Sequence, residues 1–83
     1  MLTEYIQAAM AKAEYEILED GTHYSHIPPC KGVLSNAETH EECESLLREV
    51  LEEWIILGFR LGHEIPVIDG IDLNFSMEPE EVA

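Results

Sequence analysis

The sequence predicts an α+β domain with the order helix, three antiparallel strands, long helix, and a short C-terminal strand or tail (α-β-β-β-α). Three observations predict it: a helical repeat of apolar residues over 39–61, an alternating pattern over 13–27, and a short strand-like segment over 32–36. A chain of 83 residues is long enough for one small domain. We therefore expect a single domain over 1–73, followed by an acidic tail over 74–83.

The long helix is the best-defined element of the sequence. Thr39 and Glu42 have the spacing of a capping box, and Gly62 followed by Pro66 marks the end of the helix. Apolar residues recur at steps of three and four, which places them on one stripe. We expect Leu47, Val50, Leu51 and Trp54 to carry the core. The whole predicted stripe is Cys43, Leu46, Leu47, Val50, Leu51, Trp54, Ile55 and Gly58.

The segment before it reads as a β-hairpin that turns at the Asp-Gly pair 20–21, with two possible turns. A two-residue turn would put Tyr15 on the same face as Tyr24. A three-residue turn over 19–21, with a glycine bulge, would align Tyr15 with Ser25 instead. We favour the longer turn because it separates an apolar face from a polar one more cleanly. The polar face would then carry Glu14, Glu16, Tyr24 and His26.

The remaining segments follow from local signals. Residues 2–12 have the apolar spacing of a short amphipathic helix, and the proline-containing stretch 28–31 predicts a loop. Residues 65–68 predict a short edge strand, followed by an Asp-Gly turn and a segment, 71–73, that docks on the domain. Two helices cover only one face of a three-stranded sheet, so water or another copy of the chain must cover the other. We therefore expect a homo-oligomer.

The charge of the chain narrows its possible partners. There are 18 acidic residues against four basic ones, for a net charge of −14. Such a surface repels phosphate backbones and anionic lipids, so we expect no direct nucleic-acid binding and no membrane binding. It would attract a basic protein, although plain solubility is an alternative explanation of the charge. Without a signal peptide or a long apolar run, a cytoplasmic location is expected.

The sequence contains no recognisable catalytic, cofactor or metal site. His23 and His26 are three apart on a strand, so they should point to opposite faces, and Cys30 and Cys43 lack metal-type spacing. The many glutamates of the long helix are typical of a solvated face. No nucleophile motif or phosphate-binding loop is present. We therefore expect a protein that is not an enzyme, with no catalytic, metal or cofactor residues.

Four motifs resemble the HicB-like antitoxin family, in its short single-domain members. They are Tyr15–Gly21 (YEILEDG), the Ile-Pro pair 27–28, Gly32, and Thr39–Cys43 (THEEC). The resemblance runs from about Tyr15 through Ile68 and more weakly over the N-terminal helix. It implies a partial ribonuclease-H-like fold that has lost the catalytic acids. It also implies a role as a type II antitoxin that binds and silences a small basic RNA-cleaving toxin of the HicA type.

Two departures limit this resemblance. Lys31 stands where many relatives carry a second proline before the glycine. Full-length relatives also append a DNA-binding domain, and the stretch after Ile68 is neither long nor basic enough for one. We therefore expect a non-catalytic protein-binding module; the alternative is a solitary structural or regulatory oligomeric domain without a toxin partner. The expected partner contacts are Tyr24, His26, Pro28, Pro29 and Gly32.

Overall fold

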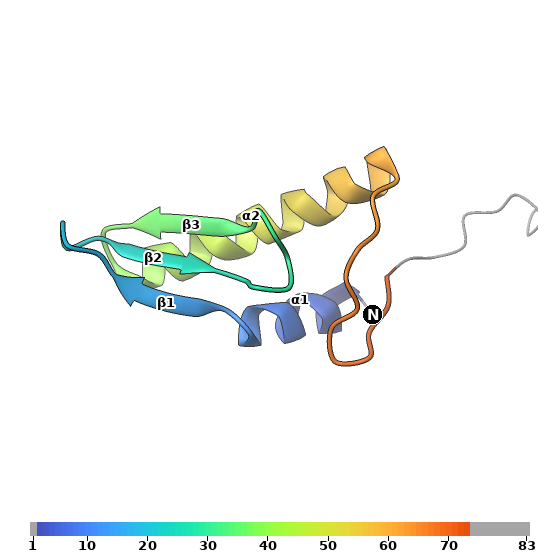
Figure 1. Ribbon diagram of the computed structural model, residues 1–83, viewed down its shortest axis with the longest axis horizontal. Coiled ribbons are helices and arrows are strands. Elements are labelled where there is room, and N and C mark those ends of the chain that lie inside the picture. Colours follow the sequence, from blue (N-terminus) through green and yellow to red (C-terminus); the bar gives the residue numbers. More distant parts are fainter. Residues whose placement is uncertain (1, 74–83) are drawn as a thin grey trace, which may run out of the picture.

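The protein, seen in a computed structural model that describes residues 2–73, follows the predicted order of elements (Figure 1). The predicted acidic tail over 74–83 lies outside the described residues. The α-β-β-β-α arrangement is confirmed. Its elements are α1 (Leu2–Ala11), β1 (Glu14–Ile17), β2 (His23–His26), β3 (Leu34–Ala37) and α2 (His40–Leu61).

The three strands form an antiparallel sheet in chain order, β1-β2-β3. The Leu18 N–H donates to the Thr22 carbonyl at 2.8 Å, which closes a three-residue loop with Gly21 at φ 86°. Tyr15 consequently lies opposite Ser25, as the longer of the two predicted turns requires. The register leaves one face of the sheet, hereafter the open face, with Glu14, Glu16, Tyr24, His26, Leu34 and Asn36.

The other face of the sheet is covered by α2, which lies behind the strands in Figure 1. The Thr39 hydroxyl accepts a hydrogen bond from the Glu42 N–H at 3.1 Å, so this half of the predicted capping box is present. At the other end Gly62 adopts the left-handed conformation, with φ 73°. The buried residues of α2, hereafter the core line, are Cys43, Leu47, Leu51, Ile55 and Gly58.

The core line is narrower than the predicted stripe. Leu47 and Leu51 are fully buried, but Leu46 is 41% exposed, and Val50 and Trp54 are only partly buried. The reason is geometric: adjacent residues on a helix are separated by about 100°, so Leu46 and Val50 point sideways when Leu47 and Leu51 face the sheet. Of the four residues expected to carry the core, Leu47 and Leu51 therefore do so, whereas Val50 and Trp54 pack against its side, and Leu46 lies outside the core line.

Helix α1 packs on α2 rather than on the sheet, and lies beyond the ends of the strands (Figure 1). The segment after Gly62, residues 63–73 (hereafter the return segment), runs back from the end of α2 towards α1. It passes α2 at Gly58, where an added Cβ would lie 2.8 Å from Ile65 Cδ1. Glycine at this position therefore allows the return segment to approach the helix closely.

The edge strand predicted over 65–68 does not join the sheet. Within the described residues, this region has one isolated bridge, between Ile68 and Ile71. Asp69 and Gly70 between them both have positive φ, at 51° and 77°, as a tight two-residue turn requires. The apolar side chains of the return segment instead pack into the core, which keeps it away from the sheet: Ile65, Ile68 and Leu73 are buried.

Tyr5 joins α1 to the return segment. Its side chain is fully buried, and its hydroxyl donates to the Pro66 carbonyl at 2.5 Å. The hydroxyl also lies 4.0 Å from the sulfur of Cys30, which is likewise buried. Burial raises the pKa of Tyr5 above its usual range, with a smaller contribution from Cys30, and burial also raises the pKa of the Cys30 thiol. Both groups are therefore held in their neutral forms.

These raised pKa values predict a loss of stability at alkaline pH. For an acid whose pKa is raised by folding, the stabilisation is present below the pKa of the unfolded chain and is lost above it. The ordinary pKa values are 9.0 for the Cys30 thiol and 10.0 for Tyr5. The free energy of unfolding should therefore fall as the pH rises above about 9. Urea denaturation at pH 7 and at about pH 10.5 would measure this loss. The fall should be smaller in a Tyr5→Phe, Cys30→Ala double variant, and an equal fall would contradict the assignment.

Candidate partner-binding face

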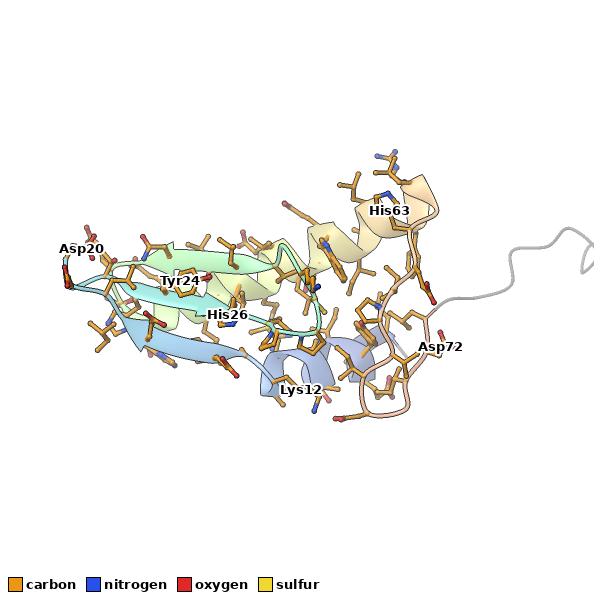
Figure 2. All side chains as sticks on the ribbon, viewed as in Figure 1. Lys12, Asp20, Tyr24, His26, His63 and Asp72 are labelled. Carbon is orange, nitrogen blue, oxygen red and sulfur yellow. The ribbon has the colours of Figure 1, made fainter. Side chains whose placement is uncertain are left out.

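The open face presents two rows of side chains across the three strands. Within the described residues no helix or loop covers it, and Leu34 at its edge is 49% exposed. Figure 2 shows Tyr24 and His26 along the central strand, with α2 behind the sheet. One row is Glu14, His26 and Leu34, and the next is Glu16, Tyr24 and Asn36.

Tyr24 and His26 form an aromatic pair at the centre of the open face. Their ring centroids are 5.7 Å apart with an interplanar angle of 28°, close to a stacked arrangement. His26 Nε2 lies 3.6 Å from a carboxylate oxygen of Glu14, while Glu16 lies opposite Tyr24. Only one of the two neighbouring glutamates thus reaches the histidine. His26 Nδ1 is buried and has no hydrogen-bond partner among the described residues.

The loop between β2 and β3 carries the other three predicted contact residues. The Ile27 N–H donates to the Val33 carbonyl at 3.2 Å and closes the loop, while the buried Cys30 anchors it. Gly32 has φ 94°, a value that favours glycine. Within the loop, Pro28 and Gly32 are exposed and Pro29 is half-buried. The five predicted contact residues thus lie on β2 and in the loop that follows it, namely Tyr24, His26, Pro28, Pro29 and Gly32.

The covered face of the sheet holds a polar cluster that the sequence did not predict. The hydroxyls of Ser25 and Ser35 are 2.7 Å apart, and the Ser35 hydroxyl donates to the Cys43 carbonyl at 2.8 Å. The Cys43 sulfur lies 3.2 Å from the Ser25 hydroxyl. These small side chains satisfy one another's hydrogen-bonding groups at the point where α2 packs on the sheet. The cluster therefore stabilises the packing of α2 on the sheet, and its only signal in the sequence is a serine at an inward-facing position of β2 and of β3.

The histidines are dispersed over the molecule. His23 lies on the covered face, with its ring centroid 6.2 Å from that of His40, so it points away from His26 as predicted. The ring of Tyr15 lies 4.6 Å from the same His40 ring, and burial raises the pKa of Tyr15, with a further contribution from Glu44. In the described part of the chain, no three histidine, cysteine or carboxylate side chains gather in a way that could hold a metal ion. Nor does any helix within residues 2–73 have the length and apolar character to span a bilayer.

Comparisons with known proteins agree with this architecture. Residues 4–66 match the model of the UPF0150-like family, from α1 into the return segment. The chain is also similar to TTHA0281 from Thermus thermophilus, whose crystal structure superposes with a TM-score of 0.83 at 32% sequence identity, covering 90% of this chain and 94% of that one. A search of the curated proteins finds no match. The family match covers well over half of the sequence, and the chain belongs to the UPF0150-like family.

Proposed function

We propose that this chain is a non-catalytic protein-binding module that acts in the cytoplasm like a HicB-type antitoxin, by binding and silencing a small basic RNA-cleaving protein. The observation that carries the proposal is the uncovered sheet face, with an aromatic pair beside two glutamates on a chain of net charge −14. The HicB-like motifs of the sequence and the membership of the UPF0150-like family both support it.

The open face has the chemistry that a basic partner requires. The neighbouring rings of Tyr24 and His26 provide a rigid contact area with little side-chain entropy to lose on binding. An arginine of the partner would find a cation–π surface on Tyr24 and a carboxylate at Glu16, directly across the strand pair. The overall negative charge would accelerate encounter with a basic protein. Binding of this kind blocks a nuclease by covering its surface and requires no chemical step from the module.

A second candidate function is a solitary oligomeric domain with a structural or regulatory role and no toxin partner. Half-exposed leucines on α2, including Leu57 at 53%, favour self-association of some kind. Self-association by itself is also compatible with the antitoxin function, because these leucines lie on α2 and the aromatic pair lies on the open face.

The antitoxin proposal predicts a complex that is sensitive to salt. Co-expression with a basic ribonuclease encoded beside this chain should give a complex that co-purifies at low salt and weakens at about 0.5 M salt, where charge is screened. Tyr24→Ala should weaken binding by at least about tenfold. The control Ile17→Ser changes a residue that is 68% exposed on the other face of the sheet, and should leave the affinity unchanged.

Two double variants with the same change in net charge separate the effect of charges on the open face from the effect of the overall charge of the chain. Glu14→Lys with Glu16→Lys changes the open face, whereas Glu49→Lys with Glu52→Lys makes the same change in net charge on exposed positions of α2. The first pair should weaken the complex far more than the second. Equal effects would contradict binding at the open face. The absence of any complex at low salt, with undiminished ribonuclease activity, would contradict the proposed function itself.

A further inference from the structure

Helix α2 carries a second line of apolar side chains beside its core line. Its members, hereafter the lateral stripe, are Val50, Trp54, Leu57 and Leu61, spaced by four, three and four residues. The first three each precede a core-line residue and therefore point about 100° away from the core. Leu57 is 53% exposed and Leu61 is 58% exposed. Val50 and Trp54 are partly buried against the core.

The four-three-four spacing is that of the a and d positions of a coiled coil, the seam along which one helix packs on another. The described chain supplies no second helix that covers this seam, because Leu57 and Leu61 stay exposed although α1 packs on α2 with Tyr5, Ile6 and Ala9 buried in the core. A seam of four residues is normally too short to hold two free helices together. Here α2 is already folded on the sheet, so pairing has no cost of helix nucleation.

We propose that the lateral stripe is a self-association surface, on which α2 pairs antiparallel with α2 of a second copy across a twofold axis. In this arrangement Trp54 packs against the partner's Leu57, and Val50 packs against the partner's Leu61. The twofold axis repeats each contact, which gives four layers in all. The proposal does not rest on the antitoxin function, and it leaves the open face free for another partner.

The charges beside the lateral stripe favour a second copy of the chain as its binding partner. Glu53 and Arg60 are both exposed, and each lies one residue before a member of the stripe, on its outer side. Antiparallel pairing brings Glu53 next to Arg60 of the partner subunit twice, whereas parallel pairing would set Glu53 and Arg60 against the core-line side of the partner helix and leave them without opposite charges. A uniformly basic partner helix would meet Arg60 with like charge. The lateral stripe and the charges beside it are therefore complementary to the same surface on a second copy of the chain.

The salt dependence of this contact should be opposite to that of the basic-partner complex. Two copies of net charge −14 repel each other, and salt screens this repulsion. The apolar contact is small compared with a standard interface, so association should be of moderate strength. We expect mainly monomer at low micromolar concentration in about 20 mM salt, and dimer at tens of micromolar in about 0.5 M salt.

Sedimentation equilibrium on the full chain tests the surface. A Leu57→Ser, Leu61→Ser double variant should raise the dimer dissociation constant by at least about tenfold. The matched control is Ile56→Ser, because Ile56 is 57% exposed but lies farther round α2 than Glu53 and Arg60, turned away from the lateral stripe, and it should leave the constant within about twofold. Circular dichroism would check that each variant is folded. Trp54 is the only tryptophan in the chain, so its emission should shift to the blue as the wild-type concentration rises, and the double variant should lose this shift.

A charge exchange tests the antiparallel arrangement. Glu53→Arg and Arg60→Glu should each weaken the dimer, although Glu53→Arg also lowers the repulsion between copies. The double exchange keeps the net charge and should restore the wild-type constant. Three results would overturn the proposal: a strict monomer at about 0.5 mM protein in high salt, equal loss of the dimer in Ile56→Ser, or a double exchange as weak as the single variants.

Discussion

Replacing Leu47 with alanine is expected to lower the free energy of unfolding by roughly 2–5 kcal/mol, since the side chain is fully buried at the centre of the core line. A loss of this size would be a large part of the stability of so small a domain. The cavity would lie between α2 and the sheet, where neighbouring side chains are held by two layers of regular structure. Urea denaturation, followed by circular dichroism, would measure the shift in the midpoint.

The adjacent leucine provides the control. Leu46 is 41% exposed and points to the side of α2, so Leu46→Ala should cost no more than about 1 kcal/mol. The two variants make the same chemical change one residue apart on the same helix. Similar losses in both would mean that α2 is rotated away from the orientation in which Leu47 faces the sheet.

Replacing Tyr5 should have the second largest effect. Tyr5→Ala removes a fully buried ring and should cost about 3–5 kcal/mol. Tyr5→Phe keeps the ring but removes the donor to the Pro66 carbonyl, which should cost about 1–3 kcal/mol. Chemical denaturation of both variants would separate packing from hydrogen bonding. Tyr24→Phe, a change of one hydroxyl on the open face, is the control and should have little effect. A Tyr5→Phe variant as stable as the wild type would show that the hydrogen bond to Pro66 contributes nothing.

The elements predicted correctly are those with local signals. The cap at Thr39, the left-handed Gly62 and the loop at Gly21 each depend on a few neighbouring residues. The packing of α1 could not be predicted in this way, because Tyr5 and Pro66 are 61 residues apart and nothing near either residue indicates the other. The difference in burial between Leu46 and Leu47 could not be predicted either. Apolar spacing indicates a wide stripe, and only the position of the sheet determines which of its residues are buried.

The candidate face could be predicted in so far as it depends on side chains alternating between the two faces of a strand. Tyr24 and His26 are two residues apart on one strand and share a face with either turn, but the longer turn adds Glu14 and Glu16 to that face, and the register confirms this. The geometry of the two rings depends on side-chain conformations that the sequence does not specify. That His26 contacts Glu14 rather than Glu16 depends on the exact register of β1 against β2. The serine and cysteine cluster beneath the sheet depends on the position of α2, which no short motif specifies.

The bond between Tyr5 and Pro66 has a consequence for the order in which the molecule folds and opens. Strands and helix from 14 to 61 pack on neighbours that are close along the chain, so their contacts close short loops and form early. The closure of α1 on the return segment joins residues 61 positions apart, and we expect it to come last. Interactions absent from the folding transition state act mainly on the rate of unfolding. We therefore expect substitutions in the two outer segments to change mainly the rate of unfolding, and substitutions in the hairpin and α2 to change mainly the rate of folding.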